Sequence, residues 1–145
     1  MIITPNRFYM SSVQNANAQT NGTTNFTDIT GLAIPMSAAD QLTFRFMVIF
    51  QQSNALDSIK IQFTAPAAPV VFAYDHHIFN ASSINAPLLG TTVPSPDTPY
   101  ISWTQGYIEN GTTEGDLQMQ FAAVSGLGTV TVLKNCNAVS WRVFP

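Results

Sequence analysis

Apolar and polar residues alternate along several short segments of the chain, and this period of two predicts β-strands. The clearest segment is Leu42–Gln51, in which every even-numbered residue from Leu42 to Phe50 is apolar. Its odd-numbered face is polar at the ends but carries Met47 and Ile49 in the middle. Apolar and polar residues alternate strictly in Ser58–Thr64, so one face of this strand should be exposed to solvent. Every window of about eleven residues either lacks the helical period of apolar residues or contains Gly or Pro.

The same pattern predicts further strands, and the later ones are separated by turn residues such as Asn110-Gly111. Val70–Asp75 is apolar on both faces, so we expect neighbours to cover both of its sides. About eight short strands at this spacing predict an all-β fold, a two-sheet antiparallel jelly-roll sandwich. The remaining predicted strands are Asn25–Thr30, Tyr100–Glu109, Asp116–Val124, Thr129–Leu133 and Ala138–Phe144.

Two segments fall outside the strand pattern. Residues 1–24 begin with several apolar residues and continue with Ser11–Thr24, which is almost entirely Ser, Asn, Gln, Thr and Ala. We interpret residues 1–24 as an extended N-terminal arm and residues 25–145 as the jelly-roll domain. Ala81–Thr98 contains Pro87, Pro94 and Pro96, which predicts a projecting loop and not a central strand.

Charged residues make up only 9% of the chain against 46% hydrophobic residues, where roughly 25% charged is usual. The polar surface must therefore come mainly from Asn, Gln, Ser and Thr, which cost less to desolvate than ions. This composition favours a protein that packs against other subunits. The net charge is −3 and the Lys and Arg residues are isolated, so we expect no nucleic-acid partner. No segment is long and apolar enough to predict a membrane span.

The sequence offers little catalytic chemistry. Asp75-His76-His77 is the densest group of potential metal ligands, but adjacent strand residues point to opposite faces. Glu109, Glu114 and Asp116 flank one turn and are too few to hold calcium. No Gly-x-Ser-x-Gly motif is present. We therefore predict a protein that is not an enzyme and uses no cofactor or metal.

Aromatic residues are the remaining candidates for binding. Trp103 and Tyr107 could stack on sugars if they are exposed, so they form our candidate recognition surface. Trp141 alternates with Val139 and Val143, which favours a place in the core or in an interface.

Two stretches of the chain resemble a jelly-roll module that recurs in structural proteins of tailed phages. One is Asn21–Leu32, leading through Ala38–Gln41 into Leu42–Phe46. The other combines Tyr107–Thr112, Gly115–Ala122 and the closing strand Ser140–Val143. The module is similar to the trimeric fold of C1q and tumour necrosis factor, and it serves in capsid decoration, head fibres or tail fibres.

This resemblance implies a virion protein, made in the host cytoplasm and placed on the capsid surface. Our leading hypothesis is a capsid decoration (cement) protein that forms a homotrimer and contacts the major capsid protein or other virion proteins. The alternative is a receptor- or glycan-binding module of a head or tail fibre. Such a module would bind its ligand through Ala81–Thr98 together with Trp103 or Tyr107. The candidate interface residues are Ile2, Ile3, Phe8, Tyr9, Met10, Met47, Ile49 and Val71.

Overall fold

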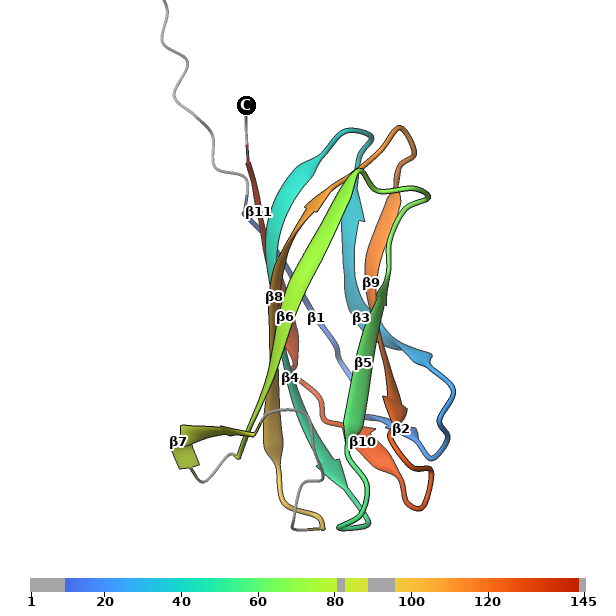
Figure 1. The fold of residues 1–145 in the computed structure, drawn as a ribbon, viewed down its shortest axis with the longest axis vertical. Coiled ribbons are helices and arrows are strands. Elements are labelled where there is room, and N and C mark those ends of the chain that lie inside the picture. Colours follow the sequence, from blue (N-terminus) through green and yellow to red (C-terminus); the bar gives the residue numbers. More distant parts are fainter. Residues whose placement is uncertain (1–9, 81–82, 89–95, 144–145) are drawn as a thin grey trace, which may run out of the picture.

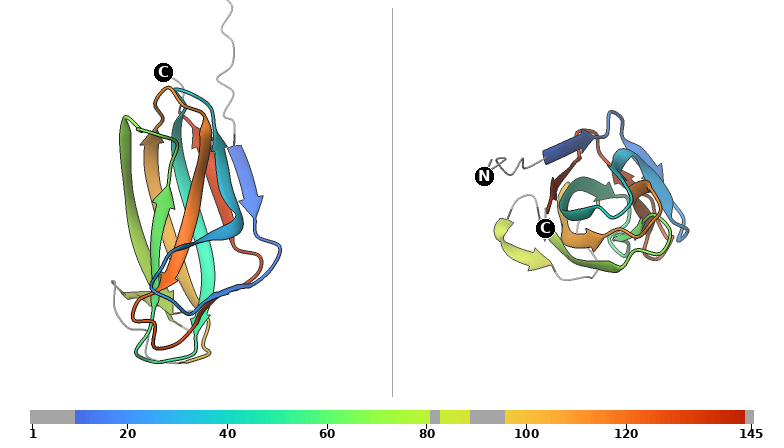
Figure 2. Two further views of the ribbon diagram at one scale, coloured as in Figure 1. Left: turned by 90° about the vertical axis from the view of Figure 1, so that its right-hand side faces the viewer. Right: turned by 90° about the horizontal axis from the view of Figure 1, so that it is seen from above.

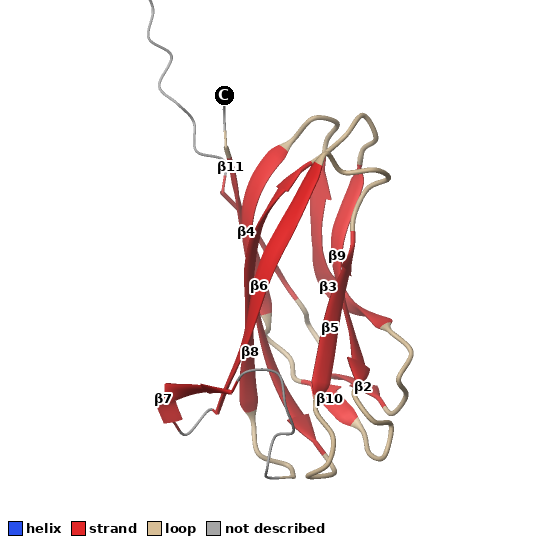
Figure 3. Cartoon of the chain, in the orientation of Figure 1, coloured by secondary structure: helices blue, strands red, loops and turns tan. Residues whose placement is uncertain are grey.

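The computed structural model describes residues 10–80, 83–88 and 96–143, and within these ranges the chain is all β, with eleven strands in two antiparallel sheets (Figures 1 and 3). The smaller sheet has the order β3 (Thr27–Met36), β9 (Gly115–Ala123), β5 (Ile59–Thr64). The larger sheet has the order β1 (Met10–Gln14), β11 (Asn137–Arg142), β4 (Gln41–Gln52), β8 (Tyr100–Glu109), β6 (Val71–Asn80), β7 (Ser83–Leu88). β10 (Val130–Val132) joins β4 to β2 (Gln19–Asn21). The predicted all-β, two-sheet antiparallel fold is confirmed, while its jelly-roll connection order stays a prediction.

The core lies between the facing sheets, and β4 is the best example of how alternation builds it. Its even-numbered side chains from Leu42 to Phe50 are all buried, as the sequence predicts. Leu117, Met119 and Phe121 of β9 face them from the smaller sheet and are equally buried. Phe63 of β5 closes the gap, with its ring centroid 5.1 Å from that of Phe46. The two sheets are thus held by one continuous apolar core.

β3 is longer than predicted because a bulge interrupts its alternation. Gly31 has a φ of 90°, and the register with β9 shifts between Asp28 and Ala33. The extra residue moves the buried positions from the odd number 29 to the even numbers 32, 34 and 36, so a strict period of two is lost. The Gln118 amide donates to the carbonyl oxygens of Ile29 and Leu32, at 3.1 and 3.3 Å, and so stabilises the bulge.

The predicted arm of residues 1–24 is wrong for its second part. β1 pairs with β11 from Met10↔Trp141 to Gln14↔Asn137, and β2 pairs with β10. These residues belong to the larger sheet, in which main-chain hydrogen bonds hold a sequence too polar to predict a strand. Of the predicted arm, residues 1–9 lie outside the described residues.

β8 runs through Gly106 without a break and pairs with β6 there. A Cβ on Gly106 would clash with the Ala73 carbonyl oxygen and with the Phe44 ring, so only glycine permits this close approach. Among the described residues, only the inner face of β6 is covered. Val71 is 42% exposed on the outer face, so this part of the chain does not supply the cover expected on both sides.

The predicted loop 81–98 contains one described strand. β7 lies at the edge of the larger sheet, where it pairs with β6, and Pro87 stands opposite Phe79. An edge strand tolerates proline because its outer side makes no ladder hydrogen bond. Residues 81–82 and 89–95 of the predicted recognition loop lie outside the described residues.

Candidate functional site

The outer face of the larger sheet carries most of the predicted binding residues. The paired strands place Trp141, Thr43, Tyr107 and Ala73 in one row across β11, β4, β8 and β6. The next row along these strands is Val139, Arg45, Gln105 and Asp75, and the row after it is Asn137, Met47, Trp103 and His77. Residues far apart in the sequence therefore share one surface. Figure 2 shows the two sheets from two further directions, with the smaller sheet in front in the left view.

Arg45 lies between two tryptophans in the middle of this face. Its guanidinium carbon is 4.8 Å from the ring centroid of Trp103 and 5.8 Å from that of Trp141. Both distances fall within the range of cation–π attraction, which contributes about 0.5 to 1 kcal/mol at an exposed site. The stack connects β8 to β11 across β4.

An open hollow of about 550 Å³ lies beside this stack. Trp141 and Tyr107 line it from opposite sides of Thr43, while Arg45, Gln105 and Asp75 line it from the neighbouring row. The two residues of the candidate recognition surface therefore lie in different surroundings. Tyr107 lines the hollow, whereas Trp103 does not and instead stacks on Arg45. The lining residues are Thr43, Phe44, Arg45, Ala73, Tyr74, Asp75, Gln105, Gly106, Tyr107 and Trp141.

The candidate interface residues are spread over this face. Met10 is 65% exposed at its β1 edge, next to Trp141, and Val71 lies at its β6 side. Met47 and Ile49 face outward but are half-buried, and Ile49 packs against the core. Ile2, Ile3, Phe8 and Tyr9 lie outside the described residues.

A second surface lies at the end of the sandwich where β4 leads into β5 and β9 into β10. Leu56 is 64% exposed and Leu127 is 65% exposed on these two connections, and Val124 beside them is 48% exposed. We call these three residues the apolar tip. The Asn54 amide donates to the Leu127 carbonyl oxygen at 3.3 Å, and its own amide oxygen accepts from the Leu56 N–H at 2.9 Å. The apolar tip could not be predicted from the sequence, because single leucines in polar connections have no periodic signal.

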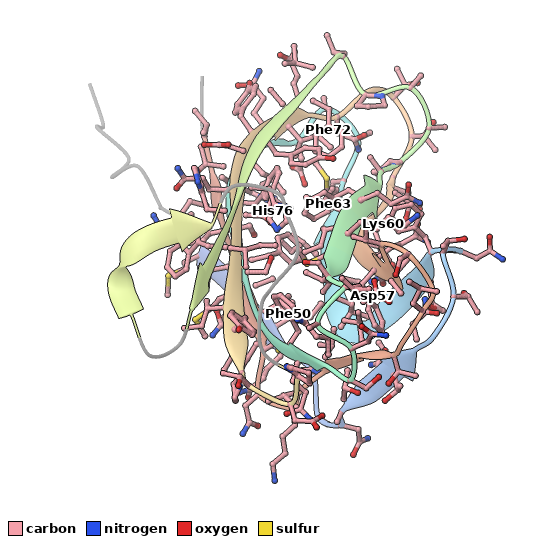
Figure 4. All side chains as sticks on the ribbon, turned by 60° about the horizontal axis from the view of Figure 1, so that its bottom comes forward. Phe50, Asp57, Lys60, Phe63, Phe72 and His76 are labelled. Atoms are coloured by element: carbon pink, nitrogen blue, oxygen red, sulfur yellow. The ribbon has the colours of Figure 1, made fainter. Side chains whose placement is uncertain are left out.

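The carboxylate of Asp57 holds the two connections together. It is fully buried and accepts hydrogen bonds from the backbone N–H groups of Ser58, Ser125 and Gly128, at 2.9, 3.0 and 3.2 Å. Burial alone would raise the pKa of Asp57, but these hydrogen bonds outweigh it and hold the pKa below its usual value. Figure 4 looks toward this end of the molecule and labels Asp57. The apolar tip is therefore displayed on a fixed backbone.

The two histidines of β6 point to opposite faces, as the sequence predicts. His76 shares a hydrogen bond of 2.7 Å with the buried hydroxyl of Ser102, and His77 shares one of 2.7 Å with Asp75 on the outer face. Burial lowers the pKa of His76, and the charge of His77 lowers it further. Within the described ranges, no three His, Cys, Asp or Glu side chains lie close enough together to hold a metal ion.

No protein-family model matches the chain, and no curated protein matches it significantly. The described part of the chain contains no helix that could cross a membrane.

Proposed function

We propose that the protein is a structural component of a phage virion, a capsid decoration (cement) protein that forms a homotrimer on the capsid surface. In this role it contacts its own copies and the major capsid protein or other virion proteins. The observation that supports this proposal best is the apolar tip. Leu56 and Leu127 are each about two-thirds exposed, on connections that a buried carboxylate holds in place.

Rigid exposed leucines suit a contact surface for a physical reason. Burying one such side chain contributes roughly 1.5 to 3 kcal/mol. A flexible loop would lose part of this gain as conformational entropy on binding, whereas a preorganised loop loses little. The connections around the apolar tip are already ordered by Asp57 and Asn54.

The composition supports the same proposal. Only 9% of the residues are charged, so a partner that packs against this chain displaces water from few ions. The outer face of the larger sheet adds Met47 and Ile49 as partly exposed apolar residues, and along β4 both lie between the hollow and the connection to β5.

The test uses capsids of the parent phage that lack this protein. We expect native mass spectrometry to show trimers, and co-sedimentation to show binding to these capsids. The double variant Leu56→Ser/Leu127→Ser should keep the parent's unfolding midpoint but lose capsid binding. Val70→Ser is the matched control, because Val70 is 66% exposed in the β5–β6 connection at the other end of the sandwich (Figure 1).

Two outcomes would contradict the proposal. One is a protein that stays monomeric at high concentration and does not sediment with the capsids. The other is a double variant that binds as well as the parent and the Val70→Ser control, since the apolar tip would then have no part in attachment.

A further inference from the structure

We propose that the hollow on the outer face of the larger sheet is a binding site for one ring of an uncharged saccharide. Trp141 and Tyr107 would hold the two faces of the ring, above Thr43. Arg45, Gln105 and Asp75 would bind its hydroxyl groups from the neighbouring row. This inference does not depend on the decoration role proposed above.

The spacing of the two aromatic side chains fits one ring. Trp141 and Tyr107 occupy the strands on either side of β4, both opposite Thr43. Neighbouring strands are about 4.8 Å apart, so these side chains rise from the sheet about 10 Å apart. A ring between them needs a carbon contact of about 3.5 to 4.0 Å on each side, which leaves the thickness of one puckered ring. The short Thr43 side chain keeps this space open.

The floor of the hollow depends on small residues. Ala73 continues the row beyond Tyr107, and Gly106 adds no side chain between β4 and β6. Because Gly106 has no Cβ, the Phe44 ring and the β6 backbone can lie close beneath the hollow. The volume of about 550 Å³ lies within the ordinary range of small-molecule sites, about 300 to 1,000 Å³.

The polar groups beside the hollow match the hydroxyls of a sugar. Arg45 supplies donors only, Gln105 supplies both donors and an acceptor, and Asp75 supplies acceptors only. Within the described residues, Arg45 and Gln105 are both exposed and their side chains make no hydrogen bond, so their hydrogen-bonding groups are open to a ligand. Asp75 binds His77 and the His76 N–H, and its two oxygens keep further lone pairs for a ligand.

The charge around the hollow favours an uncharged ligand. One cation, Arg45, and one anion, Asp75, line it and balance each other. A phosphate would meet the carboxylate of Asp75, and a basic peptide would meet the guanidinium of Arg45. A neutral sugar ring is repelled by neither charge. The aromatic side chains can bury its apolar faces while its hydroxyl groups stay at the edge.

The experiment is a titration of the full chain with the methyl glycosides of glucose, galactose and N-acetylglucosamine, followed by amide NMR shifts. We expect saturable shifts in β4, β8 and β11 around the hollow with at least one glycoside, with Kd of about 1 mM for a single ring. Tyr107→Ala and Gln105→Ala should each weaken this binding by about tenfold or more.

Thr43→Phe is the sharper variant, because it fills the space between the aromatic walls and removes none of the other lining groups. It should abolish the shifts while leaving the protein folded. Gln62→Ala, on the outer face of the smaller sheet, is the control and should bind like the parent.

Three results would overturn the inference. The first is the absence of saturable shifts with all three glycosides. The second is unchanged binding in Thr43→Phe. The third is a set of concentration-dependent shifts at Trp141 without any sugar, removed by Thr43→Phe, which would show that a side chain of another copy occupies the hollow.

Discussion

The outer faces of the two sheets use their polar side chains in different ways. On the smaller sheet, Asp28, Gln120 and Gln62 form one row, in which Gln120 donates to Asp28 and accepts from Gln62, both at 2.6 Å. On the larger sheet, Arg45 stacks on two indole rings and Gln105 faces solvent. The smaller sheet satisfies its own polar groups, while the larger sheet leaves donors and acceptors beside aromatic walls.

This difference indicates which face is available for binding. A ligand on the smaller sheet would have to break existing hydrogen bonds between side chains, and each buried group left unpaired costs about 1 to 3 kcal/mol. A ligand on the larger sheet replaces only water. Both faces belong to strands with the same alternation, so the pattern of a single strand does not distinguish them.

The largest expected effect sharpens this contrast, because the inner faces should respond alike even though the outer faces do not. Phe46→Ala in the larger sheet and Phe121→Ala in the smaller sheet should each lower the free energy of unfolding by about 3 to 5 kcal/mol. Both side chains are essentially fully buried in the same core. Urea denaturation followed by circular dichroism measures the loss. A variant as stable as the parent would mean that its strand faces the other way.

The next effect concerns Asp57, which fixes the connections between the sheets. Asp57→Ala leaves three backbone N–H groups without their acceptor, so we expect a loss of about 2 to 4 kcal/mol. The residue to compare with Asp57 is Asn110, at the opposite end of the sandwich. Its amide is uncharged and donates to the carbonyl oxygens of Ser37 and Thr113.

The same residue predicts a pH dependence with a definite sign. The pKa of Asp57 is lower in the folded chain than the usual 3.8, so its contribution to stability is present above this value and is lost as the pH falls below it. Thermal unfolding between about pH 6 and pH 3 should show a steeper acid loss for the parent than for Asp57→Asn. Parallel curves for the two proteins would show that Asp57 does not control the acid response.

A smaller effect compares the cations of the two outer faces. Arg45→Ala should cost about 1 kcal/mol, because Arg45 contacts two indole rings. Lys60→Ala should cost about 0.5 kcal/mol or less, because Lys60 lies over the single ring of Phe26, at 5.1 Å. Tryptophan fluorescence should change only in Arg45→Ala. Equal losses in the two variants would contradict a special role for the stack.

The histidines are expected to give an effect as small as that of Arg45→Ala. His76→Ala and His77→Ala should each cost about 1 kcal/mol, the net value of an ordinary hydrogen bond. Because the pKa of His76 is lowered from 6.5, its contribution is present above this pH and declines as the pH falls further. Unfolding midpoints at about pH 7.5 and pH 5.5 measure this. Loss of folding in either variant, or the same loss caused by a chelator, would instead indicate a metal site.

Much of the fold could be predicted from single strands. The buried positions of β4 and the boundaries of β8 follow from alternation, which is a local property of the chain. β1 and β2 could not be predicted, because their polar residues are held by main-chain pairing with β11 and β10. The second half of β3 was missed because the bulge at Gly31 reverses the parity of its buried residues.

The candidate sites divide in the same way. Alternation along each clear strand was enough to predict which side meets the core, and the aromatic residues Trp103 and Tyr107 could be named as binding candidates from the sequence. That Trp141, Thr43 and Tyr107 lie in one row followed from the fold, because strand order and register depend on partners distant in the sequence. The fold also decided that Leu56 and Leu127 share one end of the molecule, since the buried Asp57 joins two connections that are far apart along the chain.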